Sequence, residues 1–286
     1  MLFILSLICT FGSFIVSFII NVVNGTNIVL AFLYGICWFL GFLAFYSVII
    51  LLLLLILWNI YAKKPKPFSR FRWLLTVDIA MYSVYWLHIR VKANGLDKLP
   101  KEKPFIMYCN HQNFMDMFIL YQVFRKYPHS TLFKDEILKY PLVRGVALGM
   151  GGTPINRHND REALKSILET IKKVNNGQTF LIFPEGTRTK NTELNEYKPG
   201  SFKIAQKTNV PVVILSIDNA YKITKNMVIR RIPVEVTVID VIYPDKFPET
   251  TVEFAKIVED KTNEYIQSQR MTKKYLKVPE KYKQKL

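Results

Sequence analysis

The chain has 286 residues, half of them hydrophobic, and its 39 Lys and Arg against 22 Asp and Glu give a formal net charge of +17. All of these charges lie after an uncharged arm, because the first charged residue is Lys63. Three cysteines exclude a disulfide framework, and their spacing suits no metal site. The composition also excludes disordered and collagen-like chains, and the part after the arm is long enough for one sizeable core.

The arm consists of two apolar segments, residues 2–20 and 28–58, separated by a polar cluster typical of a turn. The first segment is close to the roughly 20 residues that cross a hydrocarbon core, and the second can span it with tilt or in part. Trp38 and Trp58 would lie about 30 Å apart on a helix, which suits one aromatic residue at each interface. We therefore predict a transmembrane helical hairpin over residues 1–62.

A basic cluster follows the arm directly: Lys63, Lys64, Lys66, Arg70 and Arg72. By the positive-inside rule it places the rest of the chain in the cytoplasm, and a hairpin leaves the N-terminus on the same side. The arm lacks the positive start and short apolar stretch of a cleaved signal peptide. Residues 73–87 are largely apolar, so we predict an interfacial amphipathic segment over residues 63–89, with an ordinary core helix as the alternative.

From residue 90 onward, short apolar runs alternate with amphipathic helical patterns. The β-rich runs are 105–109, 179–183, 210–217 and 234–242, and the helical patterns are 115–127, 163–174 and 251–269. This alternation predicts the α/β class, with a mixed, largely parallel sheet flanked by helices. We expect residues 90–286 to form one cytoplasmic domain that ends in a basic tail able to contact anionic membrane lipid.

The first candidate site is Asn110-His111-Gln112-Asn113-Phe114-Met115-Asp116, between a predicted strand and a predicted helix. This position is the carboxyl edge of a sheet, where α/β proteins bind ligands. If Asn113 caps the helix, Asp116 can turn back toward His111 and fix the tautomer of a basic imidazole. The alternative is that Asp116 only completes a capping box and favours the helix dipole.

Two further segments have the composition of anion-binding loops. Phe183-Pro184-Glu185-Gly186-Thr187-Arg188 follows another predicted strand and offers backbone N–H groups and a guanidinium to phosphate oxygens. Gly151-Gly152-Thr153-Pro154-Ile155-Asn156-Arg157 presents an arginine just before a predicted helix. Each could, on its own, be an ordinary turn.

In this order and spacing, the segments resemble the lysophosphatidic acid acyltransferase family of membrane glycerolipid acyltransferases. The N-H-x4-D block is matched by Asn110, His111 and Asp116, and F-P-E-G-T-R is matched in full. Gly151, Ile155, Asn156 and Arg157 match the block between them, Val210-Pro211 match the fourth, and Lys134 also occupies a family position. Asn113 replaces the usual Ser, while Pro154 and Asn156 are unusual in a block thought to shape the acceptor site.

The resemblance implies transfer of an acyl group from a thioester, acyl-CoA or acyl carrier protein, to the free hydroxyl of a lysophospholipid. 1-Acyl-glycerol-3-phosphate, giving phosphatidic acid, is the leading acceptor; glycerol-3-phosphate and other lysolipids are alternatives. His111 would be the base and Asp116 its partner. The implied substrate-binding residues are Lys134, Arg157, Glu185, Gly186, Thr187 and Arg188. We expect no metal and no cofactor beyond the thioester co-substrate.

Other functions remain as alternatives. A membrane lipid hydrolase could use the same His-Asp pair on water, and a membrane-bound binding protein could keep the fold without catalysis. A basic chain can also bind nucleic acid, but this one has no helix-turn-helix, zinc spacing or aromatic RNA-binding motif. Cys109 invites a covalent mechanism, although a cysteine on an apolar strand is usually a small buried hydrophobe.

Overall fold

The computed structural model describes residues 2–64, 69–102, 104–189, 192–226 and 231–279. Lys66 of the predicted basic cluster lies outside these ranges, as does the end of the predicted basic tail, 280–286.

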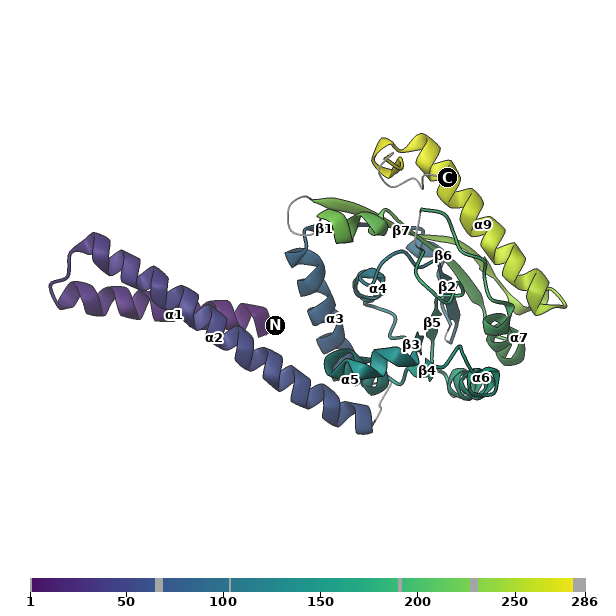
Figure 1. Ribbon diagram of the computed structural model, residues 1–286, viewed down its shortest axis with the longest axis horizontal. Coiled ribbons are helices and arrows are strands. Elements are labelled where there is room, and N and C mark those ends of the chain that lie inside the picture. Colours follow the sequence, from purple (N-terminus) through teal and green to yellow (C-terminus); the bar gives the residue numbers. More distant parts are fainter. Residues whose placement is uncertain (1, 65–68, 103, 190–191, 227–230, 280–286) are drawn as a thin grey trace.

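The arm folds as two antiparallel helices, α1 (Leu2–Val23) and α2 (Ile28–Lys63), which project from the rest of the molecule (Figure 1). Gly25 forms the turn with φ +76°, and the side chain of Asn27 caps α2 by accepting from Val29 N. The helices pack where Gly35 leaves room for the ring of Phe14. This arrangement agrees with a helical hairpin, and its insertion into a membrane stays a prediction.

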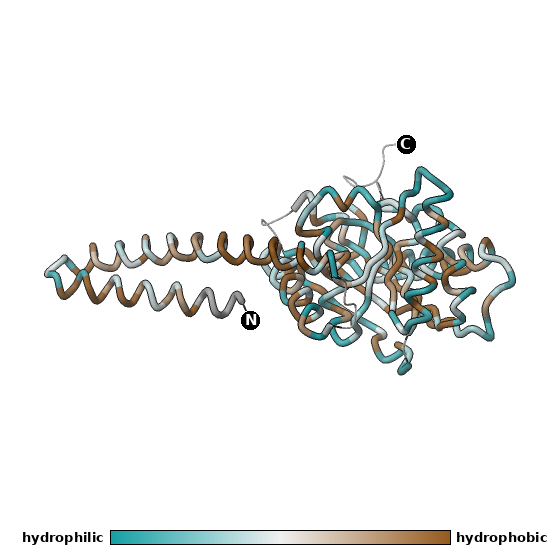
Figure 2. The backbone as a smooth tube through the Cα atoms, turned by 90° about the horizontal axis from the view of Figure 1, so that it is seen from below, coloured by the Kyte–Doolittle hydropathy of each residue, from teal (hydrophilic) through white to brown (hydrophobic). Residues whose placement is uncertain are grey.

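Helix α2 is the element best suited to a membrane. Its 36 residues are long and apolar enough to span a bilayer, by length and composition. Large apolar side chains along both helices are exposed, and Figure 2 shows the hydrophobic colouring continuing along α2 toward the globular part. An apolar surface of this kind is typical of contact with lipid.

The C-terminal end of α2 is attached to the globular part. Trp58 is fully buried against Gly145 and Gly149 of α5 (Pro141–Gly149). The Arg72 guanidinium lies 3.8 Å from the centre of the Tyr61 ring and donates to the carbonyls of Lys64 and Gly149 at 2.7 and 3.1 Å. The arm is therefore fixed to the globular part by packing as well as by the chain.

Helix α3 (Arg70–Trp86) falls in the segment predicted as interfacial, with a core helix as the alternative. Trp73, Val77, Ala80 and Val84 are buried in the core, and Trp73 Nε1 donates to the carbonyl of Arg125 at 2.7 Å. An opposite set of apolar side chains is exposed: Phe71, Leu74, Met81, Tyr82, Tyr85 and Trp86. α3 thus packs as a core helix and also presents an apolar surface.

Seven strands of the described chain form one sheet, in the order β1-β7-β6-β2-β5-β3-β4. Their bounds are β1 Ile89–Asn94, β2 Ile106–Cys109, β3 Ser130–Lys134, β4 Thr153–Ile155, β5 Phe180–Ile182, β6 Val212–Asp218 and β7 Ile232–Ile242. Each neighbouring pair is parallel except β6 and β7. The predicted mixed, largely parallel sheet is confirmed. β1, β3 and β4 were not predicted, and β1 begins one residue before the expected boundary at 90.

Helices cover both faces of this sheet (Figure 1). α3 and α4 (Asp116–Val123) enclose one core with Phe105, Met107 and Cys109. α6 (Asp160–Asn175), α7 (Lys203–Thr208) and α9 (Thr251–Thr272) enclose the other with Ile106 and Tyr108, and a short α8 (Ile223–Asn226) follows β6. Alternate residues of β2 therefore enter opposite cores, as strand geometry requires.

Candidate functional site

The candidate residues gather at the carboxyl edge of the sheet. β2 lies between β5 and β6 and runs parallel to both, so all three strands end on the same side. The loop after β2 carries His111, and the segment after β5 is the Phe183–Arg188 motif. The parallel arrangement of β2 and β5 therefore brings the two motifs into contact, although His111 and Glu185 are 74 residues apart in the sequence.

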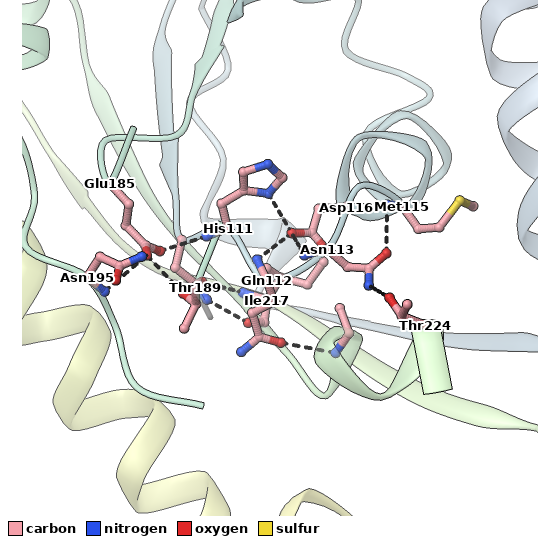
Figure 3. A network of polar contacts seen from close by, with 12 residues as sticks. His111, Gln112, Asn113, Met115, Asp116, Glu185, Thr189, Asn195, Ile217 and Thr224 are labelled. Carbon is pink, nitrogen blue, oxygen red and sulfur yellow. Dashed lines mark hydrogen bonds and ion pairs between the residues drawn. The ribbon is translucent and has the colours of Figure 1, made fainter. Parts of the chain in front are cut away.

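His111 and Asp116 form a direct pair, with 2.8 Å between His111 Nδ1 and Asp116 Oδ2 (Figure 3). The Asp116 side chain is fully buried at the start of α4, whereas 18% of the His111 side chain is exposed. An acceptor on Nδ1 assigns the proton of the neutral ring to that nitrogen and leaves Nε2 as the basic one. The expected turn of Asp116 back toward His111 is present.

The loop itself holds Asp116 in this position. Backbone N–H groups of Gln112 and Asn113 donate to Asp116 Oδ2 at 2.6 and 2.8 Å. The Asn113 side chain accepts from Met115 N at 3.1 Å and donates to Thr224 Oγ1 at 2.8 Å. The helix begins at Asp116 with Met115 as its N-cap and has no side-chain cap bond, so the expected cap by Asn113 is wrong. Asp116 nevertheless turns back to the loop and contacts His111.

The second motif contacts the first from β5. The ring of Phe183 stacks on His111, with 4.1 Å between ring centres and 20° between planes. Thr189 N donates to the His111 carbonyl at 2.9 Å. The imidazole is therefore held by a carboxylate at one ring edge and an aromatic face beside it, which limits the orientations open to Nε2.

Glu185 lies beneath the loop, where it is 2% exposed. Its Oε1 accepts from His111 N at 2.8 Å, and Oε2 accepts from Thr189 Oγ1, Asn195 N and Asn195 Nδ2 at 2.8 to 3.0 Å (Figure 3). Burial raises the pKa of Glu185, while these hydrogen bonds act to lower the pKa. Both oxygens thus bind protein groups, and the carboxylate fastens the second motif to the His111 backbone instead of facing outward.

Arg157 reaches the same motif from the segment after β4. Gly186 has φ +77°, and a Cβ placed there would lie 3.2 Å from Arg157 Nη1. Burial lowers the pKa of Arg157, and the charge of Asp135 acts against this effect. Glycine is required here both by the left-handed backbone and by the approach of the guanidinium.

The remaining predicted substrate-binding residues lie nearer the solvent. Thr187 and Arg188 are exposed at the turn of the second motif. Lys134 ends β3, pairs in register with Ile155 of β4, and forms an ion pair of 2.7 Å with Glu136. Thr187 and Arg188 are thus exposed and Lys134 is half-buried, whereas the buried Glu185 joins the two loops.

Comparison with known proteins places this geometry in a family. Residues 90–218 match the family model described as Acyltransferase, and they include all four sequence blocks. This segment, somewhat less than half of the chain, carries the acyltransferase family domain. The family segment begins within β1 and ends at the last residue of β6, so the arm, α3 and α9 lie outside it.

Several proteins similar to this chain are named 1-acyl-sn-glycerol-3-phosphate acyltransferases. A chloroplastic 1-acyl-sn-glycerol-3-phosphate acyltransferase, BAT2 of Brassica napus, is 32% identical over 66% of this chain and 54% of its own length. The enzyme of that name from Borreliella burgdorferi is 31% identical over 52% of this chain and 58% of its own. The chain spans about half the length of the curated relatives it matches.

A solved structure shares the fold of this chain. The crystal structure of the 1-acyl-sn-glycerophosphate acyltransferase PlsC from Thermotoga maritima superposes with a TM-score of 0.59 and 26% identity. The match covers 68% of this chain and 78% of that one. The predicted fold class is therefore confirmed by a related structure as well as by the sheet itself.

Cys109 is fully buried at the end of β2 and belongs to the core formed with α3 and α4. Burial raises the pKa of its thiol well above the ordinary value, and the charges of Asp116 and Glu185 raise the pKa further. A thiol is nucleophilic only as the thiolate. The environment of Cys109 thus favours the packing role over a covalent one.

Several polar residues hold the site through partners that the sequence analysis did not predict. The Asn110 side chain pairs with the backbone of Ile217: Nδ2 donates to the carbonyl at 2.9 Å, and Ile217 N donates to Oδ1 at 2.8 Å. Gln112 and Asn195 make similar contacts. Polar residues beside a motif are a weak signal, because their partners lie up to 108 residues away in the sequence.

Proposed function

We propose that this chain is a membrane-bound acyltransferase that moves an acyl group from a thioester to the free hydroxyl of 1-acyl-glycerol-3-phosphate. The product is phosphatidic acid, so the reaction belongs to phospholipid biosynthesis. The observation that carries the proposal is the buried Asp116 carboxylate on His111 Nδ1, next to a motif that Arg157 approaches. The names of the relatives support the choice of acceptor.

The chemistry assigned to the pair is general-base catalysis. His111 Nε2 takes the proton from the acceptor hydroxyl while its oxygen attacks the thioester carbonyl carbon. A C–O bond forms, the C–S bond breaks, and the imidazolium returns the proton to the departing sulfur. Asp116 stabilises the imidazolium and holds its orientation. The acyl group passes directly to the acceptor, and no covalent enzyme intermediate is needed.

Substrate binding is assigned to the groups near the surface of the site. Arg157 and Arg188 meet the acceptor phosphate, since a guanidinium offers a fork of N–H donors that matches phosphate oxygens. The Gly186 and Thr187 backbone and Lys134 complete this anion site. We assign Glu185 a positioning role, because both of its oxygens bind protein donors. The donor is acyl-CoA or acyl carrier protein.

The location follows from the arm and the charge. α2 anchors the chain in a membrane, and the basic residues after it keep the catalytic domain on the cytoplasmic side. A formal net charge of +17 attracts an anionic acceptor, an anionic donor and anionic lipid alike.

The test is acyl transfer by the purified full-length chain in detergent. The donors are acyl-CoA and acylated acyl carrier protein, each with a labelled acyl group. The acceptors are 1-acyl-glycerol-3-phosphate, glycerol-3-phosphate, a lysophosphatidylcholine and water alone. We expect labelled phosphatidic acid as the main product, and far less of it from a matched His111→Ala preparation. Label appearing only as free fatty acid would instead identify a hydrolase, and acylation of another lipid in preference would change the acceptor.

A further inference from the structure

Helix α9 lies outside the family segment, yet Arg270 near its end reaches into the carboxyl edge of the sheet. The Arg270 side chain is 8% exposed. Nε and Nη2 donate to the two oxygens of Asp218, the last residue of β6, at 2.8 and 2.6 Å. Nη1 donates to the carbonyl of Thr192, beyond the second motif, at 2.7 Å. One guanidinium therefore joins α9, β6 and that segment.

The contacts continue from Asp218 to the loop of His111. Gln112 Nε2 donates to Asp218 Oδ1 at 3.1 Å, and Ala220 N donates to Gln112 Oε1 at 3.0 Å. The backbone N–H of Gln112 is in turn one of the donors to Asp116 Oδ2. Gln112, Asp218 and Asp116 are all buried. An unbroken chain of buried polar contacts thus runs from Arg270 to the partner of His111.

We propose that Arg270 is a positioning residue for the acyl transfer proposed above, on which this inference rests. It fixes the Asp218 carboxylate, and through Gln112 it holds the backbone N–H that orients Asp116 against His111. Arginine suits this role because its planar fork binds both oxygens of Asp218 while a third N–H reaches the Thr192 carbonyl. Lysine would keep the charge and lose this geometry.

An ordinary stabilising ion pair would explain the Arg270–Asp218 contact equally well, so the kinetic test must separate the two. The variants are Arg270→Lys, Gln112→Ala and the double variant. The matched control is Lys261→Met, which removes another ion pair between α9 and the sheet, that of Lys261 with Asp240 of β7. Small displacements of reacting groups cost up to 100-fold in rate.

We expect Arg270→Lys to lower kcat about 10-fold, with KM for both substrates within about twofold, and Lys261→Met to keep the normal kcat. In the Gln112→Ala background, Arg270→Lys should cost little more, because both changes break one path. Additive losses, or equal losses in Lys261→Met, would overturn the proposal. Gln112→Ala leaves the ion pair in place, and so it tests the path even where Arg270→Lys fails to fold.

A second measurement does not depend on activity. Hydrogen exchange of the peptide covering 110–116 should become faster in Arg270→Lys and stay unchanged in Lys261→Met. Unchanged exchange in both variants would contradict the positioning role. Exchange of this peptide could become faster only in Arg270→Lys while the wild-type protein transfers no acyl group. That result would support the structural link from Arg270 to the His111 loop and reject the proposed function.

Discussion

The orientation of the His111 imidazole depends on one carboxylate oxygen, Asp116 Oδ2. Asp116 Oδ2 accepts from His111 Nδ1 and from two backbone N–H groups, so the imidazole is oriented by an acid that the loop itself fixes. We predict that His111→Ala lowers kcat by about 100- to 10,000-fold, the usual cost of losing a general base. Asp116→Asn should also lower kcat severely while substrate binding persists, because a neutral amide holds the imidazolium less well.

Single-turnover transfer of labelled acyl groups at saturating substrates measures these losses. Circular dichroism of each variant is the control for folding. A near-normal rate in folded His111→Ala would remove the base from the mechanism.

Substitution of Cys109, unlike that of His111 or Asp116, should have little effect on the transfer rate. Its thiol is fully buried and its pKa is raised by that burial, so the nucleophilic thiolate is scarce near neutral pH. We predict that Cys109→Ser retains most of the transfer rate. The assay is the same labelled transfer, accompanied by a search for acylated protein on denaturing gels. An inactive but folded serine variant, with acyl label on the wild-type protein, would point to a covalent thiol intermediate.

Arg157 is the residue through which acceptor affinity can be tested. Its guanidinium lies against Gly186 of the second motif. Arg157→Lys and Arg188→Lys each keep the charge and lose the fork. We predict that the rate at low acceptor concentration falls by more than the rate at saturation. An acceptor KM equal to that of the wild type in both variants would argue against phosphate binding by these side chains.

At the scale of elements, the strands predicted from the sequence are those that carry a run of apolar or β-branched residues. β2 and β5 are continuous apolar runs, as buried strands of a parallel sheet should be, and β6 and β7 are rich in Val and Ile despite a few polar residues. β1 and β4 lie at the two edges of the sheet, where Arg90 and Lys92 interrupt one run and Pro154 the other. β3 has a strand composition but only five residues beside a helix, which gives a weak pattern.

The attachment of α2 to α5 gives a prediction about an element. A Cβ at Gly145 would lie 2.6 to 2.8 Å from the Cβ, backbone carbon and carbonyl oxygen of Trp58, so the two helices must separate to admit it. We predict that Gly145→Val destabilises the protein by about 1–3 kcal/mol through overpacking. Gly41→Val is the matched control, since nothing lies within 4 Å of a Cβ at Gly41.

Thermal unfolding of both variants in the same detergent, followed by circular dichroism, makes this comparison. Equal unfolding temperatures would mean that α2 and α5 are not packed together in solution.

At the scale of the whole molecule, a site depends on contacts between distant parts of the chain. His111 and Asp116 are five residues apart, and a loop followed by a helix made their pairing predictable from spacing. Gln112 and Asp218 are 106 residues apart, and Arg270 lies another 52 residues along. No local pattern specifies such a pairing, since it depends on which strand ends lie side by side. For the same reason, the burial of Glu185 could not be anticipated from a motif that also suits phosphate binding.

The topology of the whole chain is also testable. The uncharged arm and the basic residues that follow it predict that both termini are cytoplasmic. A reporter or a single reactive cysteine at either terminus of the full chain should stay shielded from membrane-impermeant reagents in intact cells and react after lysis. Labelling of the C-terminal position in intact cells would reverse the orientation and separate the domain from cytoplasmic thioesters.

The docking of Trp58 on α5 has a consequence for how substrate arrives. α2 is continuous from the turn at Asn27 to its buried end, a rod of about 45 Å up to Trp58, and its last turns are packed against the domain that carries His111. With α2 in the bilayer, its packing on α5 fixes the orientation of the domain relative to the membrane. The length of α2 then sets the distance between the domain and the bilayer. Acceptor must then come by lateral diffusion, so turnover should follow the mole fraction of lysolipid in the membrane and not its total concentration.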